Sequence, residues 1–245
     1  MRRHHGLQGE FSWKTLPVWR FRSTFPSVRA TKTEFPCPIA YSPAVKLTTD
    51  LLLKGYRTGI FPMAINLRGD IAWFSPDPRA IIPLDDRFHI SKSLQRTVRQ
   101  RRFEITFDED FPSVIRACAK THGDTWISKE IINAYSLLHA EGHVHSIESR
   151  IGGKLAGGLY GVHVGGAFFG ESMFHLATDA SKIALVALVQ HLRERGFALL
   201  DTQWMTPHLE RFGTSLVSKE DYLQMLKDAV KMNVTWGAKI ERATA

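Results

Sequence analysis

The chain has 245 residues, of which 44% are hydrophobic and 23% are charged, and it carries a net charge of +8. This composition is typical of a globular protein and excludes a chain that is mostly disordered. A chain of this length can bury roughly 70–75% of its unfolded surface, enough for one large domain or a domain with a smaller one. The longest apolar run, 183–189, is far shorter than the ~20 residues of a membrane-spanning helix, so we expect no membrane segment.

Positive charge is concentrated in the first 35 residues, which hold seven basic and two acidic side chains and so carry +5 of the total. The segment has no apolar core of the kind that secretory signals contain, so we expect no such signal. Its Arg-rich, acid-poor composition loosely resembles an organellar transit peptide. We interpret it instead as a basic arm with little order of its own.

The next elements predict a small N-terminal domain. Residues 36–45 contain three prolines and predict an extended linker, and a short helix is expected over 46–57, ending near Gly59. The segment 59–62 is expected to lead into a loop, and 73–79, with two prolines, is expected to be a rigid connector. We place a domain boundary there, which gives an N-terminal extension and small domain over 1–77 and a larger domain over 78–245.

A compact basic segment follows, with six Lys or Arg residues between 87 and 102 and no acidic residue among them. A helix over 89–102 would turn Leu94 and Val98 to the core. Three of the bases would share another face of that helix, namely Lys92, Arg96 and Arg99. A basic stripe binds a phosphate backbone by releasing counterions, so we predict contact with tRNA; a solvated surface helix is the alternative.

The remaining chain predicts an α+β domain, because an antiparallel meander is followed by a helix and a further strand. Alternation and glycine turns predict five strands, over 103–107, 144–150, 154–162, 167–174 and 198–205. Helical periodicity predicts five helices, over 111–120, 129–140, 182–195, 208–212 and 219–231. Asp179 or Ser181 is expected to cap the third of these helices, and Gly196 to end it.

Polar side chains interrupt two of the apolar strands. Glu171 lies among phenylalanines, where a carboxylate without a partner is costly to bury. Asp201 and Gln203 are two residues apart, so they should project together near the end of their strand. A capping or structural hydrogen bond would explain any one of them, but the three together mark a candidate catalytic site.

Common cofactor motifs are absent from the sequence: it holds neither a dinucleotide fingerprint, nor a P-loop, nor a zinc-protease motif. His143 and His145 form a weak metal signal, and we interpret His145 as a structural hydrogen-bonding group. The two cysteines, Cys37 and Cys118, have no spacing typical of a disulfide framework or a zinc site, which fits a reducing compartment. We therefore expect no cofactor and no metal.

Ten short motifs together resemble the leucyl/phenylalanyl-tRNA–protein transferase family, and the resemblance covers about residues 43–228. They occur in this order: G-I-F-P (59–62), W-F-S-P-D-P-R (73–79), H-I-S-K-S (89–93), T-W-I (125–127), H-x-H-S-I-E (143–148), G-G-L-Y-G-V (157–162), G-E-S-M-F (170–174), A-S-K (180–182), D-T-Q (201–203) and H-L-x-x-F-G (208–213). The sequence departs from the family at Met63, where members often have Trp, and at 38–41, where a glycine-rich stretch is usual.

The resemblance implies a C-terminal domain with the GNAT-type acetyltransferase fold. It also implies transfer of Leu, Phe or Met from aminoacyl-tRNA to a protein whose N-terminal residue is Arg or Lys. The product would be an N-degron, made in the bacterial cytoplasm without a cofactor. We expect a monomer whose partners are the aminoacyl-tRNA and the acceptor protein or peptide.

The resemblance also implies roles for individual residues. Asp201 and Gln203 would lie at the reacting centre, Glu171 in the aminoacyl pocket, and Trp126 against the terminal adenosine. The apolar pocket would comprise Leu159, Phe168, Leu185, Leu188 and Leu192. The three leucines at 185–192 also share one helix face, a spacing that an ordinary core explains equally well.

The chemistry suits these residues, because an aminoacyl ester is already activated and an α-amine is partly neutral near pH 7. Asp201, oriented with Gln203, would accept or relay the amine's proton, unless the tRNA ribose hydroxyl does so. An acetyl-CoA-dependent acetyltransferase is one alternative, but 174–181 lacks the usual pyrophosphate motif. A non-catalytic RNA-binding protein is another, but it leaves Glu171, Asp201 and Gln203 unexplained.

Overall fold

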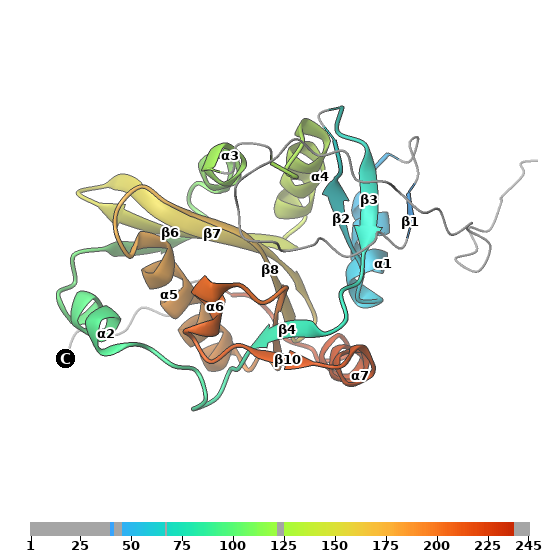
Figure 1. The fold of residues 1–245 in the computed structure, drawn as a ribbon. Helices are drawn as coiled ribbons and strands as arrows, with labels where there is room; N and C mark the ends of the chain where they lie inside the picture. Colours follow the sequence, from blue (N-terminus) through green and yellow to red (C-terminus); the bar gives the residue numbers. More distant parts are fainter. Residues whose placement is uncertain (1–39, 42–45, 67, 122–124, 238–245) are drawn as a thin grey trace, which may run out of the picture. The chain divides into compact units, whose positions relative to one another are not determined.

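The computed structural model describes residues 40–41, 46–66, 68–121 and 125–237 (Figure 1). The predicted basic arm, Cys37 and most of the predicted linker lie outside the described residues.

A small antiparallel sheet forms the first part of the fold, in the order β1 (Ala40–Tyr41), β3 (Ile71–Phe74) and β2 (Phe61–Ala64). The predicted first helix is confirmed as α1 (Thr49–Arg57), whose first turn is capped by the side chain of Thr48.

Two predictions about loops in this region were wrong. The segment 59–62, expected to lead into a loop, leads instead into β2, which continues to Ala64. Pro62 is tolerated there because β2 is an edge strand. Trp73 and Phe74, expected in the connector, belong to β3, so only 75–78 joins the two sheets. Short strands rich in buried aromatic residues carry too little alternation to be separated from loops by pattern.

A seven-stranded sheet forms the larger part of the fold, in the order β10-β4-β9-β8-β7-β6-β5. Its strands are β4 (Arg79–Ile82), β5 (Glu104–Phe107), β6 (Val144–Ile151), β7 (Lys154–Val164), β8 (Ala167–His175), β9 (Leu199–Gln203) and β10 (Ser215–Val217). The predicted meander is confirmed as β6-β7-β8, whereas β4 and β10 were not predicted. Only β8 and β9 are parallel among the described strands, and α5 crosses between them.

The remaining helices are α2 (Lys92–Arg99), α3 (Phe111–Thr121), α4 (Lys129–Ala140), α5 (Ala180–Arg195), α6 (Pro207–Glu210) and α7 (Lys219–Ala229). Gly196 ends α5 in the left-handed conformation, as predicted. Asp179 is the N-cap residue of α5, but the predicted side-chain cap is wrong. The Asp179 carboxylate accepts instead from Lys182 Nζ, at 2.7 Å, and from the Thr97 hydroxyl.

The predicted basic helix is shorter than expected, because Ser91 caps it and Arg101 adopts a positive φ of 46° just beyond it. Leu94 is buried as predicted, but Val98 is 41% exposed, so its predicted core position was wrong. The helix contacts α5, and its half-buried Thr97 donates to Asp179, the N-cap residue of α5, so position 97 and not Val98 faces the fold. The three predicted tRNA-binding residues, Lys92, Arg96 and Arg99, are all exposed.

Two apolar clusters cover the two faces of the large sheet, which gives a mixed α+β fold (Figure 1). The first cluster contains α3 and α4 and extends to α1 and α7, whereas the second is built on α5. Successive residues of β8 and β9 point to opposite faces of the sheet and so belong to different clusters. Phe168 and Leu200 lie in the second cluster, whereas Phe169 and Leu199 lie in the first.

Candidate active site

Glu171 and Asp201 lie at β-bulges in the adjacent strands β8 and β9. Tyr160 pairs with Ser172 and Gly161 with Gly170, which leaves Glu171 as the extra residue of β8. In β9, Thr202 is the extra residue opposite β4. Bulges re-aim side chains and are frequent beside active sites. They explain how polar groups leave the regular alternation of two buried strands.

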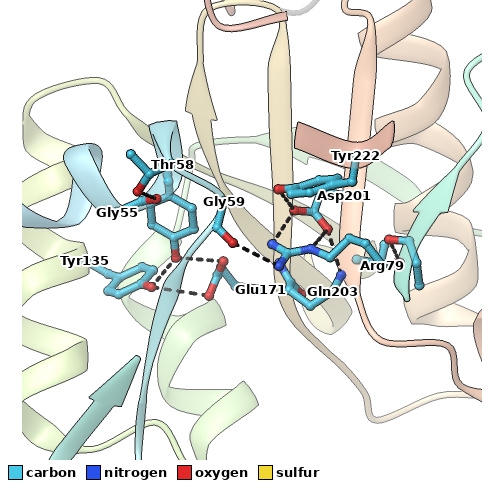
Figure 2. A network of polar contacts seen from close by, with 12 residues as sticks. Gly55, Thr58, Gly59, Arg79, Tyr135, Glu171, Asp201, Gln203 and Tyr222 are labelled. Atoms are coloured by element: carbon cyan, nitrogen blue, oxygen red, sulfur yellow. Dashed lines mark hydrogen bonds and ion pairs between the residues drawn. The ribbon is translucent and has the colours of Figure 1, made fainter. Parts of the chain in front are cut away.

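Asp201 is fully buried and all of its acceptor capacity is used. Its Oδ1 accepts from Arg79 Nε and from the backbone N–H of Gln203, both at 2.9 Å. Its Oδ2 accepts from Arg79 Nη2 and from the Tyr222 hydroxyl, both at 2.7 Å (Figure 2). A carboxylate offers about four acceptor positions. Asp201 is therefore a clamp that fixes the three groups around it.

Arg79, the cation of this ion pair, is 1% exposed and lies at the start of β4. Its remaining nitrogen donates to the carbonyl of Gly59, and its guanidinium lies over the Tyr222 ring, 4.4 Å from the centroid. Burial lowers the pKa of Arg79, but the charge and hydrogen bonds of Asp201 outweigh this and raise it overall. The pair is held as two ions in a low-dielectric site.

Glu171 forms a second hydrogen-bonded cluster, with Tyr56 of α1 and Tyr135 of α4 (Figure 2). The Tyr56 hydroxyl donates to Oε1 at 2.8 Å and the Tyr135 hydroxyl approaches Oε2 at 3.3 Å, while the two hydroxyls also contact each other. Burial raises the pKa of Glu171 to about 8, an effect that Asp201 reinforces and that the tyrosine hydrogen bonds and Arg79 oppose.

The hydrogen atoms of this triangle agree with that raised pKa. Three contacts join the three side chains, but the two tyrosines supply only two hydroxyl protons. A protonated Glu171 supplies the third, so each contact then has its own proton. An ionised Glu171 leaves one of the oxygen–oxygen contacts without a proton.

Gln203, the last residue of β9, is held in a rarely adopted conformation with φ at +60°. Its backbone N–H is fixed by Asp201, and its side-chain Nε2 is buried without a hydrogen-bond partner among the described residues. Residues other than glycine kept in this region cluster at functional sites. A strained backbone and an unused amide donor together single out Gln203 as a group that can contact a substrate.

The structure brings the three predicted polar residues into one region, because Asp201 acts electrostatically on Glu171 and binds Gln203. The five predicted pocket residues lie together in the second cluster, across the sheet from the first cluster, which holds the tyrosines that bind Glu171 and Asp201. They are Leu159, Phe168, Leu185, Leu188 and Leu192. Trp126 is half-buried against the first cluster, and its backbone carbonyl accepts from Ala64 of β2.

Sequence reasoning missed four residues of this site: Tyr56, Arg79, Tyr135 and Tyr222. Arg79 is the last residue of the predicted connector at 73–79, and Tyr56 lies within the predicted helix over 46–57; neither was predicted to belong to a site. Arg79 lies 122 positions from its partner Asp201. A carboxylate in an apolar strand signals that a buried cation or hydroxyl exists, but not where it lies in the chain.

The predicted structural role of His145 is confirmed, since its Nδ1 bonds to Asp108 at 2.8 Å. The described part of the chain holds no group of three His, Cys, Asp or Glu residues that could bind a metal ion. Cys118 is buried as a free thiol, and burial raises its pKa to about 12. Within the same described ranges, no helix has the length and apolar character needed to cross a membrane.

Comparison with known proteins places these residues in a family. The model described as leucyl/phenylalanyl-tRNA protein transferase matches residues 81–227, and that of the family's N-terminal domain matches 46–77. The chain belongs to the leucyl/phenylalanyl-tRNA protein transferase family. The matched residues include Glu171, Asp201 and Gln203, and Tyr56 lies in the N-terminal match. Membership makes the chain an aminoacyltransferase.

Individual relatives agree with this assignment. The leucyl/phenylalanyl-tRNA–protein transferase of Herpetosiphon aurantiacus is 52% identical over 191 residues, covering 78% of this chain and 98% of the relative. That of Akkermansia muciniphila is 53% identical over 188 residues, covering 76% and 97%. The solved structure of L-PGS from Bacillus licheniformis gives a TM-score of only 0.35 at 11% identity over 62% of this chain and 51% of that one, too weak to establish a common fold.

Proposed function

We propose that the protein transfers Leu, Phe or Met from aminoacyl-tRNA to the N-terminal Arg or Lys of a protein or peptide. The new peptide bond replaces the aminoacyl ester and turns the acceptor into an N-degron. We place the reaction in the cytoplasm, where aminoacyl-tRNA is made. The observation that carries the proposal is the pair of bulges that sets Glu171 and Gln203 beside the Arg79–Asp201 clamp in a chain of this family.

Glu171 is suited to exchange a proton with the attacking amine. An α-amino group has a pKa of about 7.7–8.0, and burial raises the pKa of Glu171 to about 8. Proton transfer between the α-ammonium and the Glu171 carboxylate is therefore nearly balanced in free energy. The neutral amine attacks the ester carbonyl and forms the C–N bond. As the C–O bond to the tRNA ribose breaks, the proton that the nitrogen loses is passed to the ribose oxygen and restores its hydroxyl.

Gln203 and Asp201 take different parts in the same reaction. We place the Gln203 carboxamide against the reacting groups, because its Nε2 is uncommitted and is able to donate to the oxyanion that develops on the ester carbonyl. Asp201 has no free acceptor position, so it acts as a positioning residue that holds Gln203 and Arg79. Asp201 was expected to accept or relay the proton of the amine. In this arrangement, Glu171 or the ribose hydroxyl takes that proton instead.

The aminoacyl side chain is proposed to enter the second apolar cluster beside the three leucines of α5, and Trp126 to contact the terminal adenosine. The basic stripe of α2 is proposed to contact tRNA, since Lys92, Arg96 and Arg99 form no ion pair with an acid in the described part of the chain. We keep the GNAT-type fold of the larger domain, the monomeric state and the boundary at 77/78 as proposals; family models that match on either side support the boundary.

The test is a transfer assay with labelled Leu-tRNA and two peptides that differ only in their first residue. We expect label in an Arg-starting peptide and none in an Ala-starting peptide, without ATP or a coenzyme. Equal labelling of both peptides, or a requirement for acetyl-CoA, would overturn the proposal.

A further inference from the structure

A cavity of about 360 Å³, lined mainly by polar and charged residues, opens at the C-terminal ends of the two parallel strands, outside the site described above. His175 is the last residue of β8, and His208 lies in α6, which follows β9. Ser181 and Lys182 line the cavity from the first turn of α5. A strand–helix–strand unit with parallel strands places its ligand sites at this end, where the crossover helix begins.

The charge around the cavity is mainly positive. Asp179, its acidic lining residue, forms an ion pair with Lys182 Nζ at 2.7 Å, so these two charges cancel. The remaining basic lining residues are Arg211 and the two histidines, His175 and His208. The positive charge also affects the pKa of His208. Burial lowers this pKa most, and electrostatic repulsion from Lys182, His175 and Arg211 lowers it further. The His208 ring packs edge-on against Phe212, and its Nε2 atom is buried without a hydrogen-bond partner among the described residues. An anion in the cavity would relieve this repulsion.

Hydrogen-bond donors face the same space. The N-cap residue Asp179 of this 16-residue helix adopts a left-handed conformation and makes no side-chain cap. The Ala180 N–H donates to the Ala177 carbonyl, so the Ser181 and Lys182 N–H groups are the donors of the first turn that another acceptor can take. The positive end of the helix dipole adds to the field. Hydroxyls of Thr178 and Ser181 complete a lining of donors and cations that suits a phosphate group.

The position of the cavity connects two parts of the proposed donor site. Thr97 of α2 donates to Asp179, so the cavity lies next to the helix that carries the basic stripe. His175 lies four residues beyond Glu171 on β8, about 13 Å along an extended strand. A nucleic-acid strand that runs from α2 towards Glu171 therefore has a short run of nucleotides beside the cavity.

We propose that this cavity binds a backbone phosphate in the single-stranded 3′ end of the aminoacyl-tRNA. The inference rests on the proposed function, because it takes the donor to be aminoacyl-tRNA. The ligand chemistry is a phosphodiester anion, held by Arg211, by the first turn of α5 and by the hydroxyls at 178 and 181. A free phosphate ion shares this chemistry, and the experiment separates the two sources.

The experiment compares two donors, aminoacyl-tRNA and aminoacyl-adenosine, which has no phosphate. Arg211→Gln removes an exposed lining charge without touching the buried core. We expect it to raise KM for aminoacyl-tRNA about tenfold, as loss of a charge-assisted hydrogen bond does, and to leave kinetics with aminoacyl-adenosine unchanged. The log–log salt slope of tRNA binding should flatten by about 0.7, the value of one single-strand phosphate contact.

Arg116→Gln is the matched control, because Arg116 is an exposed arginine on α3, which packs against the other face of the sheet. It should change neither KM nor the salt slope. Equal KM changes for both donors, no change for either, or the same slope change in both variants would overturn the proposal. So would an Arg211→Gln effect on inhibition by inorganic phosphate without any effect on tRNA, which would indicate a site for free phosphate.

Binding of uncharged tRNA separates failure of this inference from failure of the proposed function. If the wild type transfers nothing from any donor, the proposed function fails, while the salt slope of tRNA binding still tests the cavity. If the wild type transfers normally and Arg211→Gln binds tRNA like the wild type, only the cavity assignment fails.

Discussion

Two carboxylates on neighbouring strands of this protein, Asp201 and Glu171, lie in opposite hydrogen-bonding environments. Asp201 is fully buried, and its oxygens accept four hydrogen bonds, two of them from a bidentate arginine. Glu171 faces two tyrosines that supply one proton too few, and burial raises its pKa to about 8. The comparison teaches that the surrounding donors decide what a carboxylate can accept: Asp201 has no acceptor position left, whereas burial raises the pKa of Glu171 into the range of an α-amine.

The largest effect should follow from breaking the clamp around Asp201. Arg79→Met leaves a buried carboxylate without its cation, which should lower the free energy of unfolding by about 3–5 kcal/mol. Urea denaturation measures this directly. The double variant Arg79→Met/Asp201→Leu is the control, because it removes both charges and should recover much of that loss without restoring transfer. A double variant no more stable than the single one would contradict the ion-pair account.

Gln203 should matter to catalysis more than to stability. Gln203→Ala removes the uncommitted amide donor but keeps the backbone N–H that Asp201 holds, so turnover should fall by about 10²-fold. Circular dichroism and the midpoint of thermal unfolding should stay close to those of the wild type. A near-normal turnover would make Gln203 a structural residue and leave the strain at φ +60° unexplained.

Glu171 should give the protein a pH dependence that its amide replacement lacks. Its folded pKa of about 8 exceeds the unfolded value of about 4.3, so the folded chain holds a proton that the unfolded chain releases. The wild type should therefore lose stability as the pH rises from about 4 to about 8, and Glu171→Gln should lose less. Urea midpoints across this range test the sign, which would be reversed if Glu171 were a conventional ion-paired carboxylate.

The smallest effect should follow from the loss of the hydrogen bond between Tyr56 and Glu171. Tyr56→Phe removes a hydrogen bond that lowers the pKa of Glu171, so the pKa should rise and the transfer–pH profile should move to higher pH. The cost in stability should be about 1 kcal/mol. Thr58→Ala, which removes a hydroxyl from the C-cap of the same helix, is the control and should leave the profile in place.

The sequence alone predicts the longer elements of this fold because their periodicity is local. The helix at 129–140 and the strand at 144–151 agree with prediction to within a residue. The short strands β4 and β10 have too few residues for a pattern. Arg79 could not be predicted as a site residue for a different reason: its partner, Asp201, is far away in the chain.

The sequence alone singles out three polar residues of the candidate site, and their roles stay predictions. Glu171, Asp201 and Gln203 were found because polar residues are rare in buried strands. The bulges that aim them follow from pairing with β7 and β4, which only the three-dimensional register reveals. Whether a buried carboxylate is saturated or free depends on Tyr56, Tyr135, Tyr222 and Arg79, four residues that no local pattern links to it.

Carbon-13 NMR of glutamate carboxyl groups, labelled in wild type and in Glu171→Gln, tests the division of roles most directly. We predict one resonance that titrates near pH 8 in the wild type, is protonated at pH 6, and is absent from the variant. If every glutamate resonance titrates within about one pH unit of 4.3, Glu171 is an ordinary ionised carboxylate and the central claim is contradicted.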